Sequence, residues 1–295
     1  MINLRSGTAA GSPPEELEKI LTSAFGERGC ELTVDVVEPG QVEEKLRDAA
    51  SGGAEIIIAG GGDGTVRTAA SLLLNSNKVV GILPLGTLNR LARDLGIPLD
   101  LQQAAQALAN AEVTAIDVAM VQDRVFLCQS MIGLGSEITE HRQRLRGRPL
   151  GKQLAGYSGL LSHLWQARRG LSLVVENANE KRFVRAMSLI VSNNCYAERP
   201  SLMLHRPRLN QGCLGLYISK HRRGPAVLGA LFKAALGRWR SDPDIEDTRG
   251  RSIVVDSFLP RIKVSNDGEL ETLTFPLTYA IRPLALQVLV PASNA

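Results

Sequence analysis

Few aromatic residues, few histidines and only four cysteines occur in this sequence. Aromatic residues make up 4% of the chain, and none of the 4 histidines stands at a spacing typical of a metal site. The cysteines are Cys30, Cys128, Cys195 and Cys213, and no two of them form a C-x-x-C pair. This usage argues against a disulfide framework and is typical of a reducing compartment, so we expect a cytoplasmic protein.

Long hydrophobic runs are also missing. No stretch reaches the roughly 18 apolar residues that a membrane-spanning helix needs, and the first residues lack the apolar core of a signal peptide. The net charge of +4, with a pI near 9.0, is too weakly basic to indicate a nucleic-acid partner. It favours a phosphate-bearing ligand or an anionic membrane surface, which such a protein would meet from the side.

The chain is long enough for two domains, and its pattern changes near residue 115. Before that point, β-branched runs at 31–37, 55–59 and 78–84 alternate with helical patterns. Those helical patterns lie at about 14–28, 41–51, 65–76, 88–95 and 101–110. Strands separated by helices predict a parallel sheet, so we expect an α/β domain over 1–115. Because Asn3 follows Met1 so closely, we expect either a very short first strand or a chain truncated at its start.

Strand-like runs dominate the rest of the chain, from 116 to 295. Examples are RVFLCQSMI, LSLVVE, CLGLYIS and RSIVVDSF, with LTYAI and LALQVLV near the end. Few long helices intervene, which predicts a mostly antiparallel β-sandwich domain. Two helical insertions are expected, near 152–169 and 225–238.

A glycine-rich loop, GGGDGT at 60–65, follows the predicted strand at 55–59. Glycines let the backbone approach an anion closely, and the N–H groups at the start of the next helix face it. Thr65 is a candidate cap of that helix, or its hydroxyl could instead contact a phosphate oxygen. A tight turn would explain one or two glycines, but not four around an aspartate. The loop is neither G-x-G-x-x-G, which needs glycine at position 65, nor a G-K-[S/T] loop.

Two more loops carry the same kind of residues after predicted strands. One lies in GILPLGTLNRLARDLGIP at 81–98 and the other in INLRSGTAAG at 2–11. In open α/β sheets, ligands bind at the carboxyl ends of the strands, where all three loops would lie. Together the three loops predict a phosphate-binding edge of the sheet.

Two of these motifs carry a family resemblance. GGDGT at 61–65, followed by LPLGTLNRLARDLGIP at 83–98, resembles the diacylglycerol kinase catalytic-domain family, whose relatives include sphingosine and ceramide kinases. The resemblance extends to IDV at 116–118, SMIGLGSEI at 130–138, NDGE at 266–269 and RPLALQVLVP at 282–291. It therefore covers nearly the whole chain in the right order.

The resemblance implies an ATP-dependent lipid kinase. Its fold would join an N-terminal α/β domain, similar to that of NAD kinases and phosphofructokinases, to a C-terminal β-sandwich that takes the lipid. ATP, with Mg²⁺, would donate its γ-phosphoryl group to a lipid hydroxyl such as that of diacylglycerol. The nucleotide-binding residues implied by matching position are Asn3, Ser6, Gly7, Gly61, Gly62, Asp63, Gly64, Thr65, Gly86, Thr87 and Asn89.

The resemblance also assigns the acidic residues. Glu269 would be the catalytic base, and Asp267 the neighbour that orients it or contacts the metal. From spacing alone, Asn-Asp-Gly is better interpreted as a plain hairpin turn, and the resemblance reverses that preference. Asp63 would lie beside the phosphates, where a carboxylate needs a cation such as Mg²⁺ between them. Asp117 lies in an apolar strand, as either a metal-site residue or a structural aspartate.

Some positions depart from the family's pattern. Arg67 and Thr68 replace the usual Asn-Glu after GGDGT, and Arg90 replaces an aspartate common in the second loop. Gln211–Gly212 stands where some members hold a structural Mg²⁺ with Asp-Gly, which puts that metal site in doubt. Basic residues interleaved with leucines from 141 to 175 are typical of a helix on an anionic membrane, or of a core-facing helix with solvated arginines.

Two other functions stay open. A soluble-metabolite kinase of the NAD kinase type shares GGDGT, although LPLGTLN argues against it. The departures at Arg67, Arg90 and Gln211 leave room for an inactive nucleotide- or lipid-binding module. The lipid itself, and the oligomeric state, are not indicated by any motif.

Overall fold

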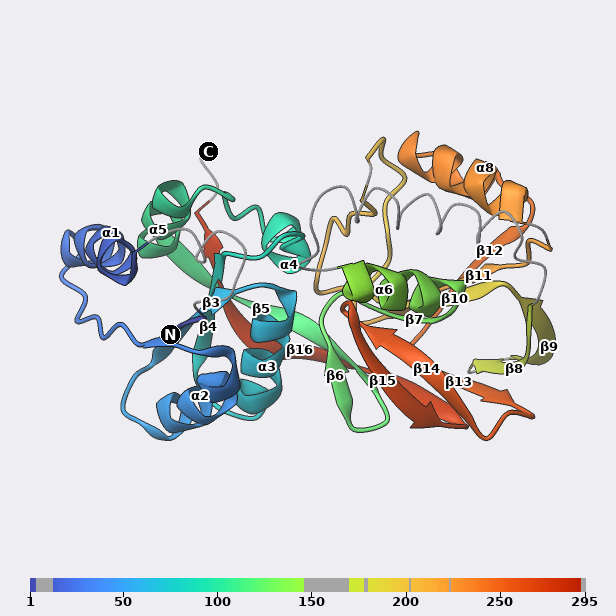
Figure 1. Cartoon of the computed structure of the whole chain (residues 1–295), viewed down its shortest axis with the longest axis horizontal. Coiled ribbons are helices and arrows are strands. Elements are labelled where there is room, and N and C mark those ends of the chain that lie inside the picture. The colour runs from blue at the N-terminus through green and yellow to red at the C-terminus, as the bar shows by residue number, and fades with distance from the viewer. Residues whose placement is uncertain (4–12, 146–169, 178–179, 202, 223, 293–295) are drawn as a thin grey trace. The chain divides into compact units, whose positions relative to one another are not determined.

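The computed structural model describes residues 1–3, 13–145, 170–177, 180–201, 203–222 and 224–292 of the 295-residue chain (Figure 1). The chain forms two compact units. Unit 1 comprises Met1–Val118 and Pro283–Ala295, and unit 2 comprises Ala119–Arg282. We describe each unit by itself.

Unit 1 is an α/β unit built on a parallel sheet. Its strands are β1 (Ile2–Asn3), β2 (Val36–Val37), β3 (Ile56–Gly61), β4 (Val79–Pro84), the start of β5 (Ala111–Val121) and the end of β16 (Leu277–Pro291). Their order is β2-β1-β3-β4-β16, and each of these neighbouring pairs is parallel. The helices are α1 (Pro14–Gly26), the short η2 (Pro39–Gln41), α2 (Val42–Ser51), α3 (Asp63–Leu73), α4 (Arg90–Asp94) and α5 (Leu101–Ala109).

The central strands of unit 1 are buried because crossover helices cover them. All six residues of β4 are buried, which explains an apolar run without alternation. The predicted helices at 14–28, 41–51 and 101–110 are confirmed as α1, α2 and α5. The strand predicted over 31–37 is only Val36–Val37, and these two residues pair with the two residues of β1.

Unit 2 contains two antiparallel sheets. The first continues from the start of β16 through β13 (Ser252–Ser257) and β8 (Leu171–Asn177) to β9 (Glu180–Ala186). The second has the order β12 (Ile245–Gly250), β11 (Leu214–Ser219), β10 (Ser188–Asn193), β7 (Gln129–Gly133), β14 (Arg261–Asn266) and β15 (Glu269–Thr274). A short strand, β6 (Arg124–Phe126), pairs with β5. The helical segments are α6 (Leu134–Leu145), α8 (Gly224–Ala235) and η3 (Trp239–Ser241).

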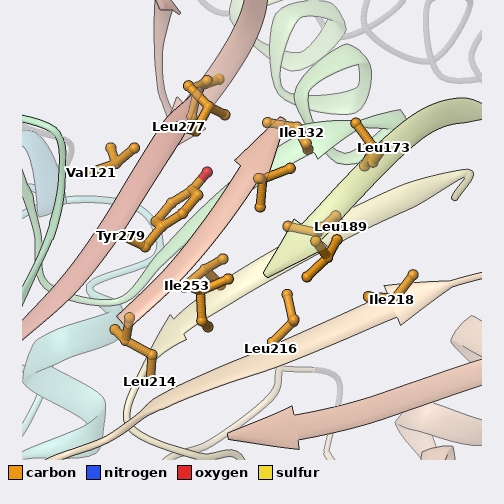
Figure 2. Packing of buried hydrophobic residues seen from close by; sticks show 14 of the residues in the cluster. Val121, Ile132, Leu173, Leu189, Leu214, Leu216, Ile218, Ile253, Leu277 and Tyr279 are labelled. Carbon is orange, nitrogen blue, oxygen red and sulfur yellow. The ribbon is translucent and has the colours of Figure 1, made fainter. Parts of the chain in front are cut away.

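The inner faces of these two sheets form one hydrophobic core (Figure 2). Leu214, Leu216 and Ile218 project from β11 in one sheet toward Ile253 and Tyr279 in the other. On β13 and the first half of β16 the core positions alternate with more exposed ones, as is usual in an antiparallel sandwich, whereas β11 is buried on both faces from Leu214 to Ile218. The predicted fold class, an α/β domain and a β-sandwich domain, is therefore confirmed.

Several elements differ from the expectation. Helix α6 was not predicted, and β12 and β15 were missed because their sequences, IEDTRG and ELETLT, are polar. The runs LTYAI and LALQVLV form one long strand, β16, rather than two. Its second half pairs with β4, so residues 283–295 belong to unit 1 rather than to the domain predicted over 116–295.

The two predicted helical insertions have different outcomes. Helix α8 confirms the insertion near 225–238, whereas the one near 152–169 lies outside the described residues, as does most of the basic stretch. Among the described residues, no helix is both long and apolar enough to cross a membrane.

Candidate functional site

The loop between β3 and α3 is the first part of the candidate site. Helix α3 begins at Asp63, with Gly62 in extended backbone before it. A Cβ on Gly61 would lie 2.5 Å from the side chain of Thr65, so only glycine fits there. The backbone N–H groups of the first turn of α3 have no partner within the helix, which makes this terminus suited to an anion.

The loop between β4 and α4 packs directly against the first one. A Cβ on Gly86 would lie 2.4 Å from the Cα of Gly62, a distance that no side chain tolerates. The two glycines therefore allow the two loops to touch through their backbones. This contact explains why both motifs need glycine at these positions.

The side chain of Asp63 joins the two loops. Its Oδ1 accepts a hydrogen bond of 2.7 Å from the backbone N–H of Arg90, the first residue of α4. A carboxylate stabilises a helix N-terminus both as an acceptor and through its charge. Asp63 thus belongs to the first turn of α3, and its side chain accepts a hydrogen bond from the first residue of α4.

Asn89 shapes the second loop from within. It is buried, with a left-handed φ of 47°, a conformation that asparagine adopts more readily than most residues. Its Oδ1 accepts from the N–H of Gly86 at 2.9 Å, and its Nδ2 donates to the carbonyls of Gly86 and Pro84 at 2.7 and 3.2 Å. Thr87 is exposed at the tip of this loop.

The end of β1 lies beside the glycine-rich loop. The Nδ2 of Asn3 donates to the Oγ1 of Thr65 at 3.2 Å, and Thr65 is buried. The expectation that Thr65 caps the helix is wrong, because the helix begins two residues earlier and places Thr65 inside its first turn. Ser6 and Gly7 lie outside the described residues.

Asp117 holds the bend of β16 in unit 1. Its side chain is fully buried, and its Oδ1 accepts from the N–H of Leu284 at 2.9 Å. Leu284 has a positive φ of 51°, so the bend needs such an anchor. Of the two roles that the sequence leaves open for Asp117, this contact favours a structural aspartate over a metal-site residue.

The NDGE turn joins β14 to β15 in unit 2, and the buried Asp267 anchors it. The carboxylate accepts three backbone hydrogen bonds, from Leu127 at 2.6 Å, Cys128 at 2.8 Å and Gln129 at 2.9 Å. Leu127 and Cys128 connect β6 to β7, and Gln129 is the first residue of β7. The left-handed φ values of Asp267 and Gly268, 51° and 91°, form the turn itself. Asp267 is thereby placed to orient its neighbours.

Glu269 follows on the same turn and is partly exposed. Gln143 of α6 donates through Nε2 to the carbonyl of Gly268 at 2.9 Å and to Oε2 of Glu269 at 3.4 Å. A neutral amide can hold the carboxylate in place without neutralising its charge. Sequence reasoning missed Gln143, because nothing indicated a helix at this point.

A second support of the turn was also missed. Arg206 is almost fully buried, and its guanidinium donates to the carbonyls of Leu127 and Asn193. Asn193 donates to the same Leu127 carbonyl at 3.0 Å. An arginine in the segment HRPRL gives no sign of burial in sequence, since arginines are mostly exposed.

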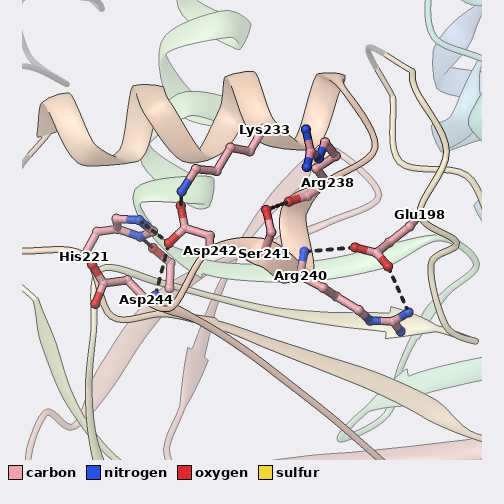
Figure 3. Close-up of polar contacts among 9 residues, drawn as sticks. Glu198, His221, Lys233, Arg238, Arg240, Ser241, Asp242 and Asp244 are labelled. Carbon is pink, nitrogen blue, oxygen red and sulfur yellow. Dashed lines mark hydrogen bonds and ion pairs between the residues drawn. The ribbon is translucent and has the colours of Figure 1, made fainter.

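A polar cluster around Asp242 lies elsewhere in unit 2 (Figure 3). Asp242 meets the Nε2 of His221 at 3.3 Å and the Nζ of Lys233 at 3.0 Å, and the Asp244 backbone N–H donates to it at 3.1 Å. Burial alone would raise the pKa of Asp242, but the hydrogen bonds from Lys233 and Asp244 and the charge of His221 hold it below its usual value. Lys233 already supplies a positive charge, so this cluster is an ion-pair network.

The structure thus brings together Asn3, Gly61–Thr65 and Gly86–Asn89 in unit 1, and Asp267–Glu269 in unit 2. Comparison with family models covers both parts of the chain. The model of the diacylglycerol kinase catalytic domain matches residues 1–121, and that of the YegS C-terminal NAD kinase beta sandwich-like domain matches residues 131–290. The chain belongs to the diacylglycerol kinase catalytic-domain family.

Curated relatives are similar over part of their length. A "Probable lipid kinase YegS-like" of Pseudomonas syringae pv. tomato is 37% identical over 136 residues, which cover 45% of this chain and 44% of that protein. One of Yersinia enterocolitica is 40% identical over 119 residues, covering 38% and 40%. An uncharacterized protein of Synechocystis is 28% identical over 253 residues, covering 82% and 56%. The chain therefore spans about half the length of the curated relatives it matches.

Solved structures share the fold. A diacylglycerol kinase from Bacillus anthracis str. Sterne aligns with a TM-score of 0.71 at 19% identity, covering 100% of this chain and 96% of that one. A second Bacillus anthracis structure aligns with a TM-score of 0.76 at 20% identity, covering 100% and 95%. At such identity, the likeness concerns the fold.

Proposed function

We propose that this chain is an ATP-dependent lipid kinase, which transfers the γ-phosphoryl group of ATP to a lipid hydroxyl. The observation that carries the proposal is the joining of GGDGT to LGTLN through Asp63 and the N–H of Arg90. Two glycine loops held in contact present backbone N–H donors and a helix N-terminus to one region, as a polyphosphate requires. Family membership and the names of the relatives support the same activity.

The nucleotide site that we propose uses the residues of unit 1. The loops Gly61–Thr65 and Gly86–Asn89 would take the phosphates, with Asn3, Ser6 and Gly7 completing the edge. Oxygen ligands suit Mg²⁺, and Asp63 offers a half-buried carboxylate at the mouth of the glycine loop. Asp63 is therefore the residue that would hold Mg²⁺ with ATP, where the ion would neutralise phosphate charge. Asp117 fits this role less well, because its carboxylate is buried against Leu284.

Glu269 is the catalytic base that we propose. An alcohol becomes a better nucleophile when a carboxylate takes its proton as the bond to phosphorus forms. Glu269 is partly exposed and held by Gln143, so it can meet a substrate. The carboxylate of Asp267 accepts hydrogen bonds from three backbone N–H groups and thereby stabilises the turn. In this proposal Glu269 takes the proton, and Asp267 positions the turn that carries Glu269.

The acceptor is proposed to be a lipid alcohol such as diacylglycerol, met at an anionic membrane surface. The net charge of +4 favours such a surface. Large apolar side chains are also exposed on unit 2, with Phe232 at 67% and Phe258 at 91% exposure. Exposed aromatic residues of this size suit contact with lipid.

The deciding experiment compares Glu269→Ala with the wild type. A γ-labelled ATP assay on a total lipid extract, followed by mass spectrometry of the product, would identify the acceptor. We expect the variant to lose at least about 100-fold in turnover, as is typical when a positioned base is removed. Undiminished turnover would contradict the assignment of Glu269.

Glu271→Ala provides the matched control. Glu271 lies two residues further along the same strand, so it shares the same face of β15, and it pairs with Arg124 at 3.8 Å. We expect its removal to leave turnover within about two-fold, since a 3.8 Å ion pair to an exposed arginine contributes little. Phosphorylation of NAD without lipid would favour a soluble-metabolite kinase. ATP binding without turnover on any lipid would favour an inactive binding module.

A further inference from the structure

Two thiols lie side by side at the end of the β10–β11 ladder. The Sγ atoms of Cys195 and Cys213 are 3.7 Å apart, although the residues are 18 positions apart in sequence. Both residues are partly buried, whereas Cys30 is exposed and Cys128 is fully inside. A disulfide needs a sulfur separation of about 2.05 Å, so the two sulfurs would have to approach by about 1.7 Å to bond.

The backbone around both thiols is held in place. The Oδ1 of Asn194 accepts from the N–H of Gln211 at 2.9 Å, and the Oε1 of Gln211 accepts from the N–H of Cys195 at 3.4 Å. The N–H of Asn194 also donates to the carbonyl of Cys213 at 3.1 Å. These reciprocal bonds keep the two thiols close, so little further ordering is needed for them to join.

A cavity of about 470 Å³ opens onto Cys195. Gln211, Arg240 and Arg249 contribute to its lining. Arg240 pairs with Asp247 at 3.3 Å, but Arg249 forms no ion pair with any acidic side chain in the part of the chain that the structure describes. The cavity therefore offers an uncompensated positive charge beside a thiol.

We propose that Cys195 and Cys213 form a reversible disulfide by reaction with a small anionic disulfide, such as glutathione disulfide, held in this cavity. One cysteine thiolate attacks the disulfide, breaks its S–S bond and releases one thiol. The second cysteine then attacks the mixed disulfide and releases the other thiol. Two protein thiols are oxidised, and one small disulfide is reduced to two thiols.

The rate of this reaction is set by the thiolate fraction. Burial, followed by the neighbouring Cys213, raises the pKa of Cys195 to about 11, while Arg249 and Arg240 act to lower it. Cys195 is thus mainly protonated at neutral pH, and we expect oxidation to take minutes to hours. Arg249 assists by attracting the carboxylates of the small disulfide.

The disulfide would close the segment that carries Arg206. The guanidinium of Arg206 donates to the carbonyl of Leu127, and the N–H of Leu127 donates to Asp267 in the NDGE turn. Oxidation would therefore stabilise the support of that turn. For a loop of this length, we expect the melting temperature to rise by about 5 °C.

The test uses the full chain with Cys30→Ser, which removes the exposed thiol. After incubation with glutathione disulfide, we expect the intact mass to fall by two hydrogen atoms, with no adduct. Peptide mapping should link Cys195 to Cys213, and dithiothreitol should reverse the change. In the same background, Cys195→Ser and Cys213→Ser should each retain one glutathione on the remaining partner, since the second attack cannot occur.

Two outcomes would overturn the proposal. One is a folded chain whose Cys195 and Cys213 stay reduced under conditions that oxidise the urea-unfolded chain. The other concerns the cavity. Arg249→Ala should slow the reaction with glutathione disulfide several-fold and leave the reaction with neutral hydroxyethyl disulfide unchanged. If the variant reacts with glutathione disulfide as fast as its parent does, the small anionic disulfide is not held in this cavity and the proposal is wrong.

Discussion

The glycine loops of unit 1 and the NDGE turn of unit 2 hold their acidic residues in different ways. Asp63 is half-buried and accepts a backbone bond while still standing at the mouth of its loop. Asp267 is buried and gives its carboxylate to three backbone N–H groups. In unit 1 one aspartate joins the loops and is proposed to serve the chemistry, whereas in unit 2 we propose that the anchoring Asp267 and the catalytic Glu269 divide these tasks.

Asp267→Ala should have the largest effect on stability. It would leave three buried N–H groups without their acceptor, and we expect a loss of about 3–5 kcal/mol in the free energy of unfolding, measured by urea denaturation. Asp267→Asn keeps one acceptor oxygen, so its free energy of unfolding should fall by less than that of Asp267→Ala. A stable Asp267→Ala variant with normal lipid phosphorylation would contradict the anchoring role.

Gly86→Ala should have an intermediate effect. The new Cβ would meet the Cα of Gly62 at 2.4 Å and the Oδ1 of Asn89 at 2.8 Å, which forces the two loops apart. We expect the free energy of unfolding to fall by about 1–3 kcal/mol, together with a weaker affinity for ATP by calorimetry. Gly53→Ala is the control, because a Cβ there has nothing within 4 Å. Equal effects of the two substitutions would show that the loop contact is not needed.

Asp63→Asn should have the smallest effect on stability and a large one on activity. The amide oxygen can still accept from the N–H of Arg90, so we expect unfolding to change by less than about 1 kcal/mol. The lost charge should raise the Mg²⁺ concentration needed for half-maximal activity. Asp48→Asn, at an exposed position on α2, is the control. An unchanged Mg²⁺ dependence in Asp63→Asn would contradict a metal role for Asp63.

Much of unit 1 could be predicted because its signals are local. A buried strand, a glycine run and a helix follow one another within twenty residues, and each is visible in periodicity or turn chemistry. The same local logic identified Asp267–Gly268 as a turn between strands, which β14 and β15 confirm. The prediction that Thr65 caps the helix is wrong, because the helix already begins at Asp63, after Gly62.

The sequence by itself determined the fold class, the glycine loops and the turn that carries Glu269, because short-range sterics and hydrophobic periodicity specify such features. Tertiary structure alone decided the partners of the acids. Asp267 reaches N–H groups about 140 positions away, and β16 pairs with strands of both units. It also decided that Cys195 and Cys213 meet. Contacts between distant segments depend on packing and register, which no local pattern encodes.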